Sequence, residues 1–226
     1  MSRTTMAVSV ALIGAVAAGC ATAEGASGTE PEPNLYDLKQ SIADYHDSGR
    51  WDADIAREDA EAQHYLDGRL RQGVPSPAIV LDIDETSLST YGYEQEHDFG
   101  YDKEAFDRYV VERKPTAIAA TRDLVRFAES RGVAVFFVTG RRESAEMRDN
   151  SALDLREEGY PEFDGLYLRP ADDHDPSVVP YKSASRADIE RRGYRIVLNV
   201  GDQEADLAGG HAERGVKLPN PVYKTP

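Results

Sequence analysis

Apolar runs of strand length alternate with amphipathic stretches over most of this chain. The apolar runs lie at 79–83, 133–138, 165–168, 194–200 and, more weakly, 216–218. The stretches between them place apolar residues at helical spacing, at 115–132, 144–158 and 182–192. Continuous apolar runs without polar alternation are typical of parallel strands covered on both faces. The pattern therefore predicts an α/β fold, in which helices flank a parallel sheet.

Two further segments flank the first of these strands. Residues 35–72 carry apolar positions at helical spacing that are interrupted at Gly49, which predicts a helical layer of two helices before the strand. Residues 87–114 form an aromatic-rich insertion after the strand, with a helix at 102–111. Because ligands of α/β folds bind beyond the carboxyl ends of the strands, this insertion is either a cap or substrate wall over the crevice or a packed satellite layer, and packing suits most of its aromatic residues. Pro115 should open the next helix.

The N-terminal residues are typical of an export signal. Residues 6–18 are small and almost wholly apolar, too few to span a membrane comfortably, so residues 1–19 are interpreted as a signal peptide. Small residues precede Cys20, as in a bacterial lipoprotein processing site, whereas 21–23 (Ala-Thr-Ala) offer an ordinary cleavage site instead. Residues 20–34 predict a flexible tether. We expect an exported protein, anchored to the cell membrane through lipidated Cys20 or secreted freely.

Composition excludes several classes of function. The chain has 226 residues, a net charge of -15 and one cysteine, which suits one compact domain with an appendage. The negative charge argues against nucleic-acid binding, because phosphate backbones attract Lys and Arg. It leaves room for a small phosphorylated substrate in a local positive pocket. With Cys20 as the only cysteine, thiolate catalysis, a thiolate zinc site and an internal disulfide are excluded.

The end of the first strand carries the first candidate chemistry. The run at 79–83 is apolar apart from Asp82 and is followed by Asp84, and a strand's period of two would place both carboxylates on one side. Neighbouring carboxylates repel unless a cation lies beside them, and hard oxygen ligands favour Mg²⁺. One carboxylate could then attack phosphorus while the other handles a proton. In a chain with 41 acidic residues the pair could also be ordinary loop residues.

Other strand ends add matching groups. Thr139 and Gly140 follow the second strand, Asp202 and Asp206 follow the fourth, and Lys182 begins the helix before the fourth. In a parallel sheet these ends share one edge and can converge on one ligand. A hydroxyl and backbone N–H groups suit phosphate oxygens, a lysine suits a phosphoryl group, and further carboxylates complete a magnesium site. The order and placement of these residues make coincidence improbable.

These motifs resemble those of the haloacid dehalogenase (HAD) superfamily. The match consists of Asp82-x-Asp84-Glu-Thr, Val-Thr139-Gly140-Arg, Lys182 and Gly-Asp202-x-x-x-Asp206. The chain is most similar to the class C acid phosphatases of subfamily IIIB, which include lipoproteins and are relatives of plant vegetative storage proteins. The resemblance covers roughly residues 35–222 and implies a Rossmann-like HAD fold. Gly140 departs from the pattern of close relatives, which often have Asn there.

The resemblance also implies a role for each matched residue. Asp82 would be the nucleophile that forms an aspartyl-phosphate, and Asp84 the general acid and then the base. The Asp82 side chain, the Asp84 backbone carbonyl and Asp202 would bind Mg²⁺, with assistance from Asp206. Thr139 and Gly140 would hold phosphoryl oxygens, and Lys182 would neutralise charge. This agrees with the physical needs of phosphoryl transfer, which are positioning and charge neutralisation.

The leading hypothesis is thus an exported, Mg²⁺-dependent acid phosphatase that acts on small phosphomonoesters, with nucleotides among the candidate substrates. The alternatives are a non-catalytic surface binding or storage protein with the same fold, and a phosphotransferase that passes the phosphoryl group to an alcohol. An acidic pH optimum is implied only by the resemblance. In the insertion, Tyr91, Tyr93 and His97 lie near the strand end and are candidates for a wall of the substrate pocket.

Overall fold

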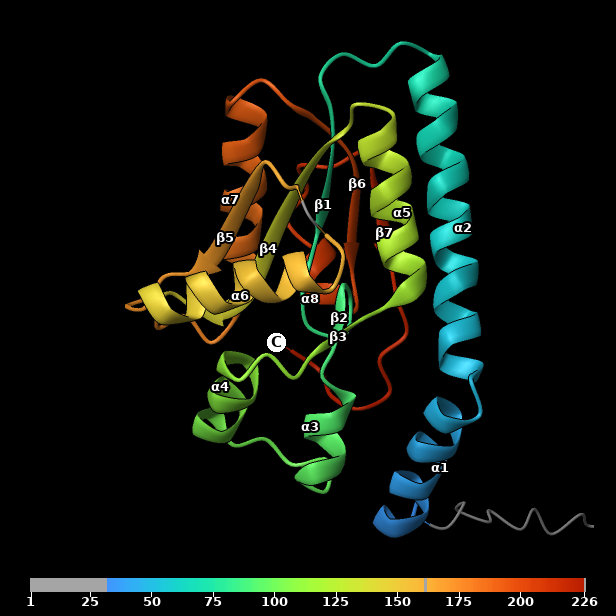
Figure 1. Ribbon diagram of the computed structural model, residues 1–226, viewed down its shortest axis with the longest axis vertical. Coiled ribbons are helices and arrows are strands. Elements are labelled where there is room, and N and C mark those ends of the chain that lie inside the picture. The colour runs from blue at the N-terminus through green and yellow to red at the C-terminus, as the bar shows by residue number, and fades with distance from the viewer. Residues whose placement is uncertain (1–31, 161, 226) are drawn as a thin grey trace, which may run out of the picture. The chain divides into compact units, whose positions relative to one another are not determined.

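A five-stranded parallel sheet forms the centre of the computed structural model (Figure 1), which describes residues 32–160 and 162–225. The described helices and strands all lie in the compact unit Asn34–Pro226. The sheet order is β5-β4-β1-β6-β7, and each neighbouring pair is parallel. The strands are β1 (Pro77–Leu81), β4 (Ala134–Arg142), β5 (Gly165–Arg169), β6 (Arg195–Gly201) and β7 (Arg214–Lys217). The predicted α/β class and parallel sheet are confirmed.

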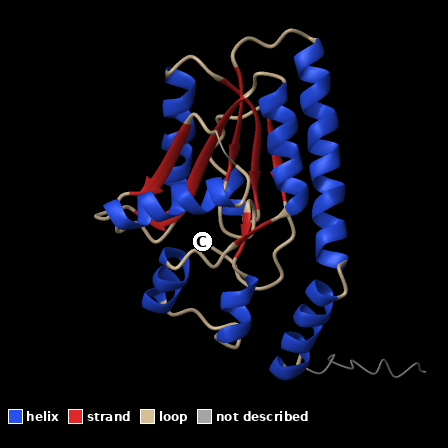
Figure 2. Ribbon diagram, viewed as in Figure 1, coloured by secondary structure: helices blue, strands red, loops and turns tan. Residues whose placement is uncertain are grey.

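Helices cover both faces of the sheet, as Figure 2 shows. Ile79 and Leu81 of β1 pack into the larger core cluster, whereas Ala78 and Val80 belong to the cluster on the opposite face. Both sets are apolar because each face of the strand is buried, which is why the sequence shows an unbroken apolar run. The helices around the sheet are α1 (Leu35–Asp47), α2 (Arg50–Arg71), α5 (Ala119–Ser130), α6 (Ala145–Glu157), α7 (Val179–Arg191) and the short α8 (Glu204–Leu207).

The predicted helical layer and the insertion are both present, with one correction. The insertion holds β2 (Leu88–Ser89), α3 (Tyr91–Glu96) and α4 (Lys103–Val111), and ends with β3 (Thr116–Ala117). Pro115 does not open a helix, as the sequence predicted. It precedes β3, which pairs antiparallel with β2, and α5 begins only at Ala119. Long-range strand pairing therefore outweighs the local preference of proline for a first helical turn.

Other boundaries differ by a few residues. Helix α7 begins at Val179 with Pro180 in its first turn, so Lys182 lies inside the helix and does not start it. Strand β4 continues through Arg142, with a register shift between Thr139 and Arg142. Cys20 and residues 1–19 lie outside the described residues. Within the described ranges, no helix combines the length and apolar character needed to cross a membrane.

A buried carboxyl group joins the two helices that pack side by side on one face. Asp59 of α2 is 3% exposed and accepts a hydrogen bond of 2.8 Å from the Thr121 hydroxyl of α5. Its second oxygen, Oδ1, has no hydrogen-bond partner. Burial raises the pKa of Asp59 to about 7, because the charged form is poorly solvated there and one hydrogen bond offsets this only in part.

We predict that Asp59 makes the protein less stable as the pH rises from about 4 to about 7. In this window the unfolded chain has released the proton while the folded chain keeps it, so the unfolding free energy falls with pH. Relative to wild type, Asp59→Asn should gain stability by up to about 1.4 kcal/mol per pH unit across the window and level off above it. Denaturant unfolding from pH 4 to pH 8 measures this. Glu61→Gln, an exposed position on the same helix, should follow wild type; a pH-independent difference for Asp59→Asn would refute the assignment.

Candidate active site

Three buried carboxylates meet at the carboxyl edge of the sheet. Asp82 directly follows β1, Asp202 directly follows β6, and Asp206 lies on α8. Each offers an oxygen, and these oxygens lie within 4.8 Å of one another. The side chains of Asp82 and Asp206 are only 8% and 5% exposed. The sequence prediction that residues from separate strand ends converge here is confirmed for these three positions.

A buried lysine links two of the carboxylates. Lys182 Nζ lies 2.5 Å from Asp82 Oδ1 and 2.5 Å from Asp206 Oδ1, and its side chain is 4% exposed. Burial alone would lower the pKa of Lys182, but the charges of Asp206 and Asp82 outweigh burial and raise it, so the ammonium stays charged. Burial raises the pKa of Asp82, and the positive charge of Lys182 opposes this rise. The lysine thus favours an ionised Asp82, the form a nucleophile requires.

Asp202 is fixed by three side chains from separate parts of the chain. Its Oδ1 accepts a hydrogen bond of 3.0 Å from the Thr86 hydroxyl. Its Oδ2 accepts hydrogen bonds from Gln203 Nε2, at 2.6 Å, and Asn220 Nδ2, at 2.7 Å. Burial and the charge of Asp206 raise the pKa of Asp202 to about 6, although the two amide hydrogen bonds oppose the rise. These contacts hold the carboxylate in one orientation.

Asp84 takes a different direction from Asp82, which corrects the expectation from strand geometry. Strand β1 ends at Leu81, and the chain then turns: Glu85 has a positive φ of 56°, and its N–H donates to the Leu88 carbonyl. The side chain of Asp84 consequently points to Arg141 and is not part of the carboxylate triad. Arg141 Nη2 donates to Asp84 Oδ1 at 2.6 Å. The repulsion between Asp82 and Asp84 is therefore offset by Arg141 and Lys182, without a metal ion shared by the two carboxylates.

Thr139 and Gly140 lie at the same edge, in β4. Thr139 is fully buried, and its hydroxyl accepts a hydrogen bond of 3.2 Å from the Arg141 N–H. Gly140 is exposed, and a Cβ placed there would meet only Val178, at 4.0 Å. The backbone at Gly140 is therefore open to a ligand, as a phosphate contact through N–H groups requires.

The predicted substrate wall is wrong for Tyr93. This side chain is 0% exposed, and it stacks on His97 and makes edge contacts with Phe106 and Tyr109. His97 is correspondingly held against that cluster, with Nδ1 2.9 Å from the Tyr93 carbonyl oxygen. Tyr93, His97, Phe106 and Tyr109 thus form a small core within the insertion.

Tyr91 packs against the helical layer. Its ring stacks on His46 of α1 at 3.5 Å between centroids, and His46 in turn stacks on Trp51. Only 8% of Tyr91 is exposed. Local spacing does not predict this contact, because the partner residues come from the helical layer about 45 residues earlier in the chain.

The C-terminal segment supplies an aromatic residue that the sequence analysis missed. Burial raises the pKa of Tyr223 well above its usual value, and the charges of Asp202 and Glu85 raise it further, so the phenol lies among the acidic groups of the site. Gln203 Nε2 donates to the Tyr223 carbonyl at 3.3 Å, and the Thr225 N–H donates to Gln203 Oε1 at 3.0 Å. Figure 1 shows the C-terminal end of the chain on the side of the sheet where the strands end. A lone tyrosine near the terminus gave no signal of this.

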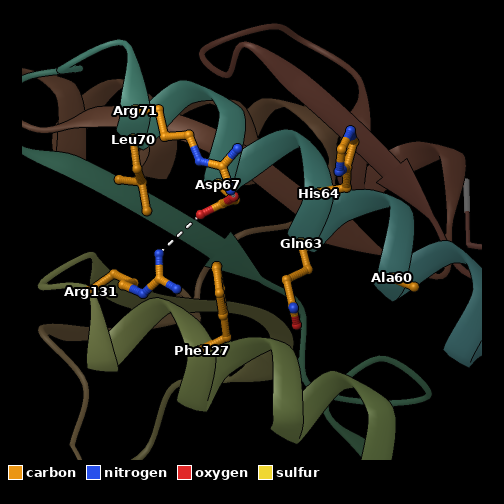
Figure 3. A pocket seen from close by; sticks show the side chains of 8 residues that line it. All are labelled: Ala60, Gln63, His64, Asp67, Leu70, Arg71, Phe127 and Arg131. Carbon is orange, nitrogen blue, oxygen red and sulfur yellow. Dashed lines mark hydrogen bonds and ion pairs between the residues drawn. The ribbon is translucent and has the colours of Figure 1, made fainter.

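A second concave region lies elsewhere and lacks this chemistry. An open groove of about 480 Å³ runs between α2 and α5 (Figure 3). Asp67 lies within it between Arg71 and Arg131, and the Arg131 guanidinium stacks over Phe127. Its one carboxylate is paired with both arginines, and none of the triad carboxylates lines it.

The carboxylate triad fits a divalent metal ion. Asp82, Asp202 and Asp206 offer hard, buried oxygen ligands from three directions, which is the donor set that Mg²⁺ and similar ions prefer. The hydrogen bonds from Gln203 and Asn220 are the outer contacts that orient such ligands. Fold and site together define an α/β protein of the HAD type.

Comparison with known proteins gives the family. The model of HAD superfamily, subfamily IIIB (acid phosphatase), matches residues 14–226, and the chain belongs to this family. The class C acid phosphatase from Bacillus anthracis has the same fold, with a TM-score of 0.68, 23% identity and coverage of 84% of this chain and 86% of that one.

Plant proteins are among the relatives in sequence. Acid phosphatase 1 of Solanum lycopersicum is 36% identical over 148 residues, 64% of this chain and 57% of its own length. The stem 28 kDa glycoprotein of Glycine max is 34% identical over 167 residues, 71% of this chain and 65% of its own length. The chain thus spans somewhat less than two thirds of these relatives.

We predict that Asn220→Ala weakens Mg²⁺ binding by about 10- to 100-fold, because Asp202 loses one of the contacts that orient it as a ligand. Titration calorimetry, and the rise of the melting temperature with added Mg²⁺, both measure this without any turnover. Gln63→Ala, on α2 away from the triad, is the control and should bind Mg²⁺ like wild type. Unchanged affinity in Asn220→Ala would remove Asn220 from the metal site.

Proposed function

We propose that this protein is a Mg²⁺-dependent phosphomonoesterase that acts through an aspartyl-phosphate on Asp82. The observation that carries the proposal is the buried Asp82 carboxylate, held 2.5 Å from the Lys182 ammonium within the acidic triad. A phosphoryl group is dianionic, so a binding site for it needs concentrated positive charge, which Lys182 supplies in an otherwise acidic protein. Membership of the acid phosphatase subfamily supports the same reaction class.

The first half of the proposed reaction transfers the phosphoryl group to the protein. A carboxylate oxygen of Asp82 attacks phosphorus, and the bond from phosphorus to the ester oxygen breaks. Asp84 donates its proton to that oxygen, so the alcohol leaves neutral. The open backbone at Thr139 and Gly140 is suited to holding the phosphoryl oxygens, and Lys182 offsets their charge.

The second half releases phosphate. Asp84, now ionised, takes a proton from a water molecule whose oxygen attacks phosphorus, and the bond to Asp82 breaks. Inorganic phosphate leaves, and both aspartates return to their initial states. A divalent ion held by Asp82, Asp202 and Asp206, with the Asp84 carbonyl oxygen as a further ligand, would neutralise charge that develops on the phosphoryl oxygens.

Two other functions of the same fold remain alternatives for the test. A storage or surface binding protein would have no need of a charged lysine buried beside the nucleophile. A phosphotransferase would use the same first half-reaction and then pass the phosphoryl group to an alcohol. Nucleotides are one class of small monoester to compare with simple aryl and alkyl phosphates.

We predict that Asp82→Asn abolishes hydrolysis of 4-nitrophenyl phosphate, with a loss of at least about 10³-fold, because the amide cannot form the covalent intermediate. Purified protein should also lose activity in EDTA and regain it with added Mg²⁺. The assay measures nitrophenol and inorganic phosphate together, across acidic and neutral pH.

The controls separate the alternatives. Asp98→Asn, an exposed carboxylate of the insertion, should keep full activity. Nitrophenol release in excess of phosphate, with glycerol phosphate formed when glycerol is added, would indicate phosphotransfer. Absence of turnover in folded, Mg²⁺-loaded wild type would favour the binding or storage protein, and full activity in Asp82→Asn would exclude the proposed nucleophile.

We further propose export, which rests on the apolar run at 6–18 and on Cys20. Expressed with its whole N-terminus in a bacterial host, the protein should partition into the detergent phase, and Cys20→Ser should move it to the aqueous phase because the lipid attachment site is lost. A wild-type protein in the aqueous phase whose first residue is Glu24 would instead support ordinary cleavage and secretion. Retention of residues 1–19 would contradict export.

A further inference from the structure

The buried face of helix α6 carries two polar side chains at positions where apolar side chains would be expected. Ser151 and Asp154 are 0% and 1% exposed, on the same inward face as Met147 and Leu155. Burying a hydroxyl and a carboxyl group destabilises the fold unless other groups form hydrogen bonds or ion pairs with them. Neither residue belongs to the acidic triad, so the reaction described above leaves both of them unexplained.

The hydroxyl of Ser151 contacts the guanidinium of Arg141. Arg141 Nη1 donates to Ser151 Oγ at 2.9 Å. Asp154 lies near the same guanidinium without a hydrogen bond to it: burial raises the pKa of Asp154 to about 7, and the positive charge of Arg141 opposes the rise. Arg141 comes from β4, and its side chain is only 1% exposed, so α6 holds it from behind.

Two other nitrogens of Arg141, Nε and Nη2, donate hydrogen bonds to Asp84. Nε lies 3.2 Å from Asp84 Oδ1 and 3.1 Å from Oδ2, and Nη2 lies 2.6 Å from Oδ1. A planar guanidinium that contacts both oxygens fixes the rotation of the carboxyl group as well as its position. The Asp84 side chain is 15% exposed, against 8% for Asp82 and 5% for Asp206. Asp84 therefore faces the open side of the site, where the alcohol part of a monoester would extend.

We propose that Ser151 is a positioning residue, which acts through Arg141 to aim the carboxyl group of Asp84 at the leaving oxygen of a bound phosphomonoester. The inference rests on the proposed function, in which Asp84 donates a proton to that oxygen. Proton donation requires a well-oriented donor at the moment the bond from phosphorus to oxygen breaks, and orientation lost through a loosened side chain lowers the rate.

This role has a kinetic signature that a purely structural role lacks. An alkyl phosphate has a poor leaving group that needs the proton, whereas 4-nitrophenolate leaves almost unaided. Misorientation of Asp84 should therefore slow only the alkyl substrate. The ratio kcat/KM reports the steps through departure of the alcohol, so it excludes the later role of Asp84 as a base toward water.

The test compares ethyl phosphate with 4-nitrophenyl phosphate in Ser151→Ala, which removes one oxygen from a buried position. We expect kcat/KM to fall about 10-fold for ethyl phosphate and less than about 2-fold for 4-nitrophenyl phosphate. Asp84→Asn should show the same preference with a larger loss. Asn150→Ala, on α6 next to Ser151 but bonded only within the helix, is the matched control and should resemble wild type on both substrates.

A second variant tests whether Ser151 acts through Arg141. Arg141→Lys removes the planar guanidinium that contacts both oxygens of Asp84, and it should show the same substrate dependence. The double variant, Ser151→Ala with Arg141→Lys, should lose no more than about 2-fold in kcat/KM for ethyl phosphate beyond Arg141→Lys alone. Equal losses on both substrates, no loss on ethyl phosphate, or additive losses in the double variant would each overturn the inference. Failure of the proposed function is distinct, because wild type would then show no Asp82-dependent hydrolysis of either substrate.

Discussion

Much of this structure depends on one buried ammonium group placed between two buried carboxylates. Lys182 contacts Asp82 at the end of β1 and Asp206 on α8, and all three side chains are nearly inaccessible to water. Charges at such depth are tolerated only when they are paired and well oriented, and loss of one partner typically costs about 3–5 kcal/mol. The ends of β1 and β6 and the first turns of α7 and α8 must therefore meet with little freedom.

Several features of the sequence follow from this constraint. Gly201 precedes Asp202 at the end of β6, where any Cβ would overlap the side chain of Asp206. Arg186, 1% exposed on α7, donates to backbone carbonyls of the segment around α8, among them that of Asp206 at 2.6 Å. The absence of a side chain at Gly201 lets Asp206 approach the end of β6, and the hydrogen bonds of Arg186 hold the segment around α8 in that position. Residues without a chemical role thus set the distance between Lys182 and Asp206.

The two acidic residues of the first motif are separated into different environments by the backbone. Asp82 continues the strand and joins the triad, whereas the turn at Glu85 directs Asp84 toward Arg141. A nucleophile beside an ammonium and metal ligands, and a proton-handling group held apart from them, have different electrostatic needs. The tight turn after β1 meets both needs within three residues.

By itself the sequence determined the fold class, the main elements and the identity of the charged residues at the strand ends. Unbroken apolar runs specify buried parallel strands, and in a parallel sheet their carboxyl ends share one edge, so the convergence of Asp82, Lys182 and Asp202 could be inferred from topology alone. Local patterns also placed the helices to within a few residues, for example the helix predicted at 144–158, which is α6 at Ala145–Glu157.

Only the tertiary structure decided how side chains from distant segments face each other. The pairing of β2 with β3 displaced the helix expected at Pro115, and Tyr91 stacks on His46 of α1. Asn220 reaches Asp202 from 18 residues further along the chain, and Ser151 reaches Arg141 from a neighbouring helix. Such contacts depend on packing angles and rotamers, which periodicity and spacing along a chain do not encode.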